Sequence, residues 1–146
     1  MKKTMILLAG ALLLAASPAS ADNDRAISVE QLPQKARQFI MQHFPKEKVA
    51  YAKREREFLE TKYEVVFTGS AKVEFLGNGE WKEVDCRYTA VPEGIVPAPI
   101  LAKTQELYPG TNVVNIDRDK RDIEVKLNNR MELTFDLKYN LVGIDD

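Results

Sequence analysis

The sequence predicts an α+β protein built as a tandem repeat, in which each copy is one helix followed by about four antiparallel strands. The first observation is that the run from Tyr63 to Asp85 returns at an offset of 60, so that Phe75 matches Phe135 and Trp81 matches Leu141. The second is that a helical period changes to strict alternation within each copy. Because one helix covers one side of a sheet, we expect a single sheet of about eight strands with both helices on one face.

Residues 1–21 have the pattern of a cleaved export signal. Two lysines precede a short apolar run, and small residues lead up to Ala21, after which we expect cleavage. No later apolar run reaches the roughly 20 residues that a membrane span needs, so we expect a soluble, exported protein. The remaining chain is predicted to form a first repeat over 22–86, a linker over 87–95 and a second repeat over 96–146.

The first repeat begins with the polar residues Asp22 to Ala26, which we expect to be a frayed terminus. A helix should follow, because Ser28 and Gln31 have the spacing of a capping box and Pro33 suits a first helical turn. The helix should end at Pro45. Residues three and four apart define its apolar stripe: Leu32, Ala36, Phe39, Ile40, His43 and Phe44.

The second helix is predicted between Pro97 and Pro109, at an offset of 64 from the first. Its stripe contains Ile100, Leu101, Thr104, Leu107 and Tyr108. Since the later strands recur at an offset of 60, the first copy has four extra residues between its helix and Tyr63. They fall in the charged segment Arg54–Lys62, which is predicted to form a lengthened hairpin.

Alternation in the strands separates an inward from an outward set of side chains. Tyr63, Val65 and Phe67 are predicted to face the helices, and Trp81 should fill the core beneath them. The strand around 48–57 and its second copy leave their inward faces undecided. The outward face has no third helix to cover it and should be open and concave; it contains Glu64, Val66, Lys72, Glu74, Glu124, Lys126, Glu132 and Thr134.

The residue inventory argues against most catalytic and cofactor-dependent classes. With a net charge of −1 and interspersed signs, the chain has no basic face for nucleic acid. His43 is the only histidine and is interpreted as structural, and Cys86 is the only cysteine and is interpreted as buried. Asp117, Asp119 and Asp122 lack the glycine of a calcium loop and are interpreted as a solvated hairpin. We therefore expect no catalytic residues, no metal and no cofactor.

The repeated motifs resemble the beta-lactamase-inhibitor-like, PepSY-like family of exported bacterial proteins. They read LP, FP, YEVVF, VEF, GEW and VD in the first copy, and VP, YP, IEVKL, LTF, NL and ID in the second. The resemblance implies a helix-plus-sheet repeat, a periplasmic location and a binding function, although likeness to an inhibitor does not transfer inhibition. Two positions depart from the repeat: Tyr139 stands where Gly79 marks a turn, and Leu76 stands where the second copy has Asp136.

The functional hypothesis is a non-enzymatic module that binds an unidentified periplasmic protein through the open face and the hairpin tip. Phe58 and Leu59 are two large apolar residues within a charged segment, which is the composition of an anchor inside a polar rim. Inhibition of a hydrolase and regulation of an envelope complex are both compatible with this hypothesis. The alternative is a small-ligand carrier or sensor that uses the concave sheet, which would need a mostly apolar pocket.

Overall fold

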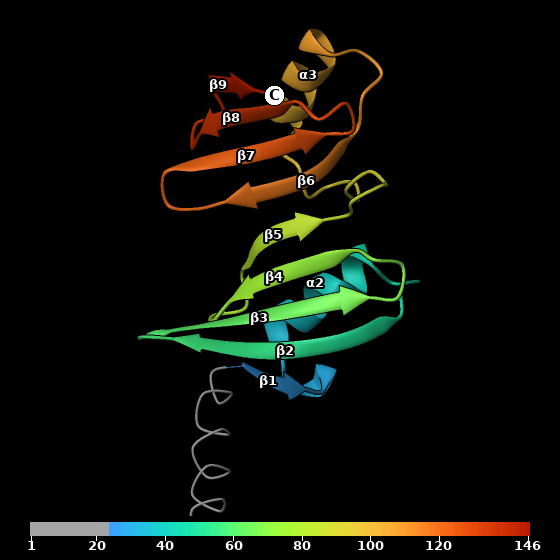
Figure 1. The fold of residues 1–146 in the computed structure, drawn as a ribbon, viewed down its shortest axis with the longest axis vertical. Coiled ribbons are helices and arrows are strands. Elements are labelled where there is room, and N and C mark those ends of the chain that lie inside the picture. Colours follow the sequence, from blue (N-terminus) through green and yellow to red (C-terminus); the bar gives the residue numbers. More distant parts are fainter. Residues whose placement is uncertain (1–23) are drawn as a thin grey trace, which may run out of the picture.

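The computed structural model describes residues 24–146, so the predicted export signal lies outside the described residues. It contains one open antiparallel sheet in which every strand lies beside the next strand of the sequence, in the order β1 to β9 (Figure 1). Both helices lie on the same face of this sheet. The strands are β1 (Asp24–Ile27), β2 (Val49–Glu57), β3 (Glu60–Phe67), β4 (Lys72–Leu76), β5 (Trp81–Asp85), β6 (Val113–Arg118), β7 (Asp122–Leu127), β8 (Glu132–Asp136) and β9 (Leu141–Asp145), and the helices are α2 (Gln34–His43) and α3 (Ala98–Leu107).

The predicted fold class is confirmed, with one strand more than expected. Strands β2 to β9 are the eight predicted ones, four after each helix. The expectation of a frayed segment over Asp22–Ala26 is wrong for its described part, because β1 pairs antiparallel with β2 and Ile27 lies opposite Ala52. The polar composition of β1 concealed this strand, since an edge strand needs only backbone pairing on one side and little apolar burial.

Helix α2 covers the first half of the sheet through its predicted apolar stripe. Ser28 and Gln31 form the expected capping box, although it caps a short 3₁₀ turn over Val29–Gln31 and α2 follows after Pro33. The ring of Phe39 meets Phe75 edge-on, with 5.6 Å between centroids. Aromatic pairs in this geometry add to the stabilisation that comes from burial alone.

Helix α3 covers the second half with a narrower buried stripe. Ile100 and Thr104 are fully buried, whereas Leu101 and Leu107 remain partly exposed. The hydroxyl of Thr104 donates to the Leu101 carbonyl at 2.7 Å, so its burial leaves no unpaired polar group. Apolar residues of the segment before α3 complete the core between the two halves: Val91, Ile95 and Val96.

The two halves share their backbone irregularities as well as their strand order. The shift in register between Val49 and Tyr51 recurs between Val113 and Asn115, and the one beside Phe75 recurs beside Phe135. These bulges turn Ala52 and Ile116 toward the core. They therefore settle which side chains of β2 and β6 face inward, which the sequence left undecided. The repeat is therefore one of backbone geometry and not only of residue pattern.

The departure at Tyr139 leaves the turn unchanged. Gly79 has a backbone φ of +90° and Tyr139 has a φ of 70°, so both turns use a left-handed residue at the same position. Glycine adopts this conformation without a steric cost, whereas tyrosine does not. The turn is thus set by its place between paired strands and not by the residue that occupies it.

Candidate functional site

The eight outward residues predicted for the open face lie in two groups on the sheet. Glu64 and Val66 of β3 pair with Glu74 and Lys72 of β4. In the second half, Glu124 and Lys126 of β7 pair with Thr134 and Glu132 of β8. Their neighbours along each strand, such as Val65 and Val125, are buried beneath the helices. Strict alternation therefore places all eight side chains on the uncovered face.

Strands β5 and β6 join these two groups into one row of carboxylates. Glu64 lies opposite Glu74, Glu74 opposite Glu83, Glu83 opposite Asp117, and Asp117 opposite Glu124. The row thus crosses five consecutive strands, and like charges in directly opposed positions are unfavourable. Sequence reasoning missed Glu83 and Asp117, because their neighbours depend on how the two repeats pair, which no local pattern encodes.

A few cations and amides partly offset this row. Lys82 donates to Asp117 at 2.9 Å, and the Asn115 amide donates to Glu83 at 3.0 Å. Lys53 lies 4.0 Å from Glu64 at the far end of the row. Glu74 and Glu124 have neither a hydrogen bond nor an ion pair among the side-chain interactions of the described residues, and of these two only Glu74 has lysines nearby, so the Glu124 end of the row is its least compensated part.

The protonation of the row reflects this environment. Burial raises the pKa of the Glu74 carboxyl, with Lys82 and Lys62 opposing the change and Glu83 reinforcing it. Partial desolvation raises the pKa of Glu124 as well, and the nearby Glu132 and Asp117 add to the effect. Both groups are therefore more costly to keep ionised in the folded protein than in the unfolded chain.

Replacing Glu74 with glutamine should raise the free energy of unfolding at pH 7 by about 0.2 to 1 kcal/mol. A raised folded-state pKa means that the native protein takes up a proton before the unfolded chain does, so the cost of the charge is full at neutral pH. The advantage of the variant should shrink as the pH falls through the raised pKa and below about pH 4. Urea melts at both pH values measure it, and a stabilisation that does not change with pH would contradict the electrostatic explanation.

The face offers little volume to a small molecule. A shallow hollow of about 160 Å³ lies over β5 to β8, lined by Glu83, Asn115, Asp117, Glu124, Val125, Lys126 and Glu132. Its lining is almost entirely polar or charged, whereas carrier sites are mostly apolar. The face is better shaped for contact with a large partner than for enclosure of a ligand.

The hairpin between β2 and β3 extends beyond the rest of the sheet, and its tip is fully exposed (Figure 1). Phe58 and Leu59 form the two-residue turn between the paired Glu57 and Glu60, and their relative exposures are 107% and 102%. Phe58 also has a backbone φ of 51°, a conformation that favours glycine over a bulky residue. The chain thus keeps a large apolar side chain where both solvent and backbone geometry oppose it.

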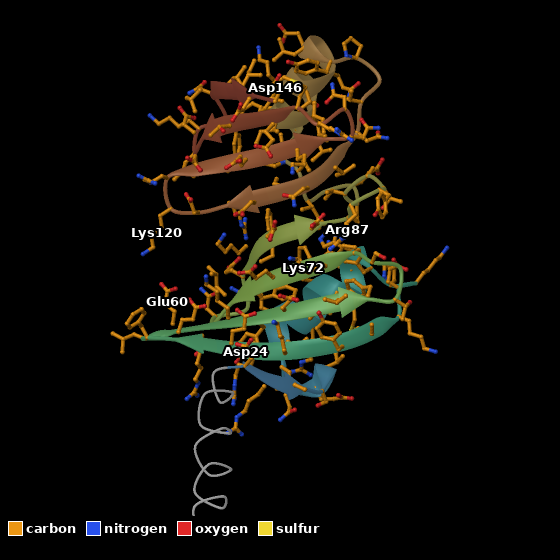
Figure 2. The ribbon with its side chains drawn as sticks, viewed as in Figure 1. Asp24, Glu60, Lys72, Arg87, Lys120 and Asp146 are labelled. Carbon is orange, nitrogen blue, oxygen red and sulfur yellow. The ribbon has the colours of Figure 1, made fainter. Side chains whose placement is uncertain are left out.

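A groove lies beside this hairpin, at the junction of the repeats. It has a volume of about 660 Å³ and is lined by Glu60, Lys62, Leu76, Glu80, Trp81, Lys82, Arg118, Asp119, Lys120 and Arg121. Figure 2 shows Glu60 and Lys120 on the same side of the molecule, where the β2–β3 hairpin faces the β6–β7 turn. The departure at Leu76 contributes an apolar residue to this groove in place of the acid found in the second repeat.

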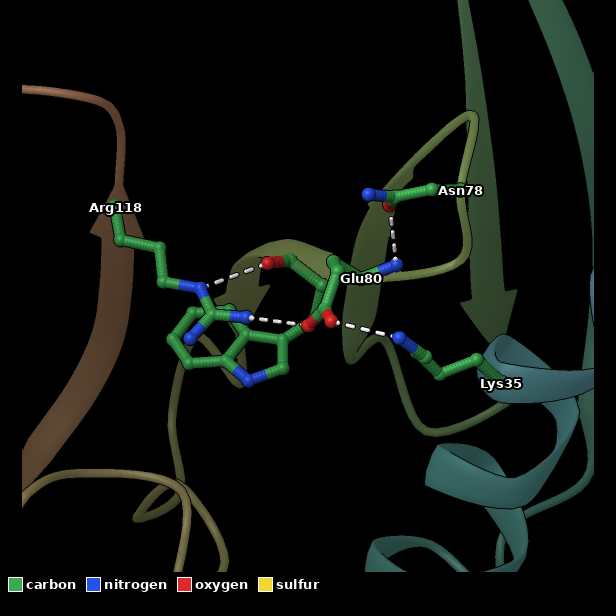
Figure 3. A network of polar contacts seen from close by, with 5 residues as sticks. Lys35, Asn78, Glu80 and Arg118 are labelled. Atoms are coloured by element: carbon green, nitrogen blue, oxygen red, sulfur yellow. Dashed lines mark hydrogen bonds and ion pairs between the residues drawn. The ribbon is translucent and has the colours of Figure 1, made fainter.

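Trp81 packs against the core beneath α2, as the repeat predicted, but it is not fully buried and also forms one wall of the groove. Its indole is only partly buried, and the Arg118 guanidinium lies 3.7 Å from the ring centroid. Arg118 also donates to the Trp81 carbonyl at 2.9 Å and contacts Glu80, which in turn binds Lys35 of α2 (Figure 3). The network therefore connects β6 of the second repeat to β5 and α2 of the first.

Three residues considered in the sequence analysis, Cys86, His43 and Asp119, have contacts that fit structural roles. Cys86 is buried, and burial raises the pKa of its thiol to about 11, so that it stays protonated at neutral pH. His43 packs against Phe39, with 4.6 Å between ring centroids. Asp119 accepts hydrogen bonds from the backbone of Arg121 and Asp122, which closes the β6–β7 turn.

Two further observations concern residues 24–146 alone. No group of three or more histidine, cysteine, aspartate or glutamate side chains in this range is arranged to hold a metal ion. Neither helix in this range has the length and apolar character that crossing a membrane requires.

Fold and surface together define a class: a two-repeat α+β protein with a meandering sheet, helices on one face and a charged open face on the other. A family model described as beta-lactamase-inhibitor-like and PepSY-like matches residues 21–62 and 61–143. The chain belongs to this family, as the sequence motifs predicted. No curated protein matches the chain.

Three solved structures have the same fold. One, from Bacteroides thetaiotaomicron and described as a "putative calcium-regulated periplasmic protein", is 55% identical, with a TM-score of 0.83 over 86% of this chain and 99% of its own. A "putative periplasmic protein" of Bacteroides vulgatus is 46% identical, with a TM-score of 0.83 over 86% and 99% of the two chains. Another protein of Bacteroides vulgatus, described as a "putative periplasmic protein of unknown function", is 34% identical, with a TM-score of 0.80 over 84% and 99% of the two chains.

Proposed function

We propose that this protein is a non-enzymatic periplasmic module that binds a protein partner through its hairpin tip and open sheet face. The observation that carries the proposal is the pair of fully exposed apolar side chains at the tip, Phe58 and Leu59, on a turn whose backbone favours glycine at Phe58. The two-residue turn requires the left-handed conformation, so a bulky residue at Phe58 in place of glycine is what the fold does not need, and this is a reason to look for a function of the side chain. Large apolar anchors surrounded by polar groups are the usual centres of binding energy.

The charge of the open face supports a partner with a basic surface. The row from Glu64 to Glu124 opposes carboxylates on five strands, which costs stability in the free protein. A cationic partner surface would remove this repulsion, and complementary charge would also speed the encounter. Tip and face then have separate roles, the tip as apolar anchor and the face as electrostatic guide.

The periplasmic location rests on the three relatives described as periplasmic and on the predicted signal over residues 1–21. The shared fold does not specify the partner, because one fold can serve many functions. Family likeness to an inhibitor makes a periplasmic hydrolase one candidate partner, and an envelope complex is another.

The Phe58→Ala plus Leu59→Ala double variant should lose at least about 90% of partner capture while the fold is unchanged. Both side chains are fully exposed, so their removal takes no contact from the core. The measurement is crosslinking and affinity capture of the tagged protein from its own periplasm. A partner that both the wild type and the double variant retain would refute the anchor.

Two further variants separate anchor loss from general loss of surface. Leu137→Ala removes an apolar side chain that is also exposed but lies in the turn after β8, and it should keep the partner. Phe58→Gly suits the positive φ and should leave thermal stability unchanged or higher, yet lose the partner. Retained capture by Phe58→Gly would show that the turn, and not the phenyl ring, is recognised.

The groove of about 660 Å³ favours a second candidate, a small-ligand carrier or sensor, since carrier pockets usually have several hundred cubic ångströms. Trp81 is the only tryptophan of the chain and lines this groove, so its fluorescence would report occupancy directly. Titration with periplasmic small-molecule extract tests the candidate. A saturable change in Trp81 emission that Leu76→Asp, on another wall of the same groove, abolishes would favour the carrier over the partner-binding module.

A further inference from the structure

The two edges of the sheet differ in what they expose. Within residues 24–146, β1 and β9 each pair with a neighbour on one side only. Strand β1 has the exposed charges of Asp24 and Arg25, and charged side chains protect an edge from further pairing. Strand β9 has no charge from Leu141 to Ile144, and its Val142 and Ile144 are 62% and 49% exposed.

The junction between the repeats shows what kind of element fits the β9 edge. At the offset of 60, β9 is the equivalent of β5, and Ile144 is the equivalent of Val84. Strand β5 continues the sheet by pairing with β6, where Val84 lies opposite Ile116. Val84 is fully buried there because β6 lies beside it, whereas Ile144 is exposed because no strand lies on the outer side of β9.

The first repeat already has such a strand at its outer edge. Strand β2 is the equivalent of β6 at the offset of 64, and β1 occupies the place next to β2 that β5 occupies next to β6. Ile27 opposite Ala52 reproduces Val84 opposite Ile116. The outer edge of β2 and the edge of β5 are therefore filled in the same register. The equivalent edge of β9 has no neighbour within the part of the chain that the structure describes.

The sequence of β9 itself matches the strand that its edge requires. Residues 113–117 of β6 read VVNID, and residues 141–145 of β9 read LVGID. Strand β9 thus occupies the position of β5 within its repeat, but its sequence is similar to that of β6. We propose that two copies of this chain associate through β9, antiparallel about a two-fold axis, with Ile144 opposite Ile144 of the second copy.

The register of this pair follows from the β5–β6 junction. There the Cys86 amide donates to the Val114 carbonyl at 2.8 Å. Asp146 is the equivalent of Cys86, so its amide would donate to the carbonyl of Val142 in the second copy, and the two-fold axis repeats the bond. The isologous contact closes after two copies, because each β9 has one free edge. Both pairs of helices would lie on the same face of the continued sheet.

The charges are also more favourable than at the template junction. Glu83 lies opposite Asp117 between β5 and β6, which places two carboxylates face to face. In the pair of β9 strands, Gly143 would take the place of Glu83 and Asp145 the place of Asp117. The opposed acids are thereby removed, and Ile144 gains apolar contact with its counterpart.

Disulfide crosslinking tests the register directly. Opposed residues in a hydrogen-bonded antiparallel pair have Cα atoms about 5.5 Å apart, within the range of a disulfide. Ile144→Cys should therefore yield a covalent dimer under a mild oxidant. Val142→Cys is the matched control, because in this register its two copies lie about 13 Å apart. Native Cys86 is buried and should not compete.

Sedimentation of the purified exported protein over a range of concentrations measures the association. Ile144→Lys should weaken dimerisation by about 10-fold or more, since lysine on an edge strand opposes pairing. Leu137→Lys changes an equally exposed apolar residue outside β9 and should leave dimerisation unchanged. A wild type that stays monomeric at every concentration, a dimer that Ile144→Lys leaves intact, or equal crosslinking at positions 142 and 144 would each overturn the proposal.

Discussion

Phe75→Ala should lower the free energy of unfolding by about 3 to 5 kcal/mol, a large part of the 5 to 15 kcal/mol typical of a small domain. The ring is completely buried and packs against Phe39 of α2, so its removal leaves a cavity that rigid strands on both sides cannot close. Phe135→Ala should cost a similar amount, because Phe135 is equally buried in the second repeat.

Both variants should still unfold in one transition at a lower urea concentration. The β5–β6 pairing, the core residues between the halves and the Arg118 network make the two repeats one cooperative unit. Urea melts followed by circular dichroism and by Trp81 fluorescence give the midpoints. Two separate transitions in either variant, with only one of them shifted, would show that the repeats unfold independently.

Gly79→Ala should cost about 2 to 4 kcal/mol, for two reasons that add. The residue has a φ of +90°, and a Cβ built there would lie 2.9 Å from the Cβ of Lys35 and 3.1 Å from that of Pro33. Both contacts belong to the start of α2, whose first turn cannot move without disturbing Ala36 in the core. Thermal or urea unfolding measures the loss.

Tyr139→Gly is the matched control for this prediction. Tyr139 has the same left-handed conformation in the equivalent turn and is 40% exposed. Its replacement by glycine relieves the strain and removes little packing, so stability should change by less than about 1 kcal/mol. A Gly79→Ala cost no larger than the change at Tyr139 would contradict the close approach of the β4–β5 turn to α2.

One part of the candidate site could be predicted from the sequence, and another part could not. The exposure of Phe58 and Leu59 followed from two apolar residues inside a charged, lengthened hairpin, and the structure confirms it. Their role in binding stays a prediction, as do the repeat boundaries at residues 86 and 96. The carboxylates of Glu83 and Asp117 joined the open face only because β5 pairs with β6, a contact between residues more than thirty positions apart.

The sequence by itself determined the repeat, the two helices, the alternation of eight strands and the family, since periodicity and turn residues are local properties that each copy repeats. Only the tertiary structure decided which strand meets which edge: β1 on β2, β5 on β6, and β9 with a free side. It also showed that Trp81 is only partly buried, packed against the core on one side and against the Arg118 guanidinium of the other repeat on the other. Edge pairing and inter-repeat contacts depend on the register of distant segments, which the residue pattern of one segment does not contain.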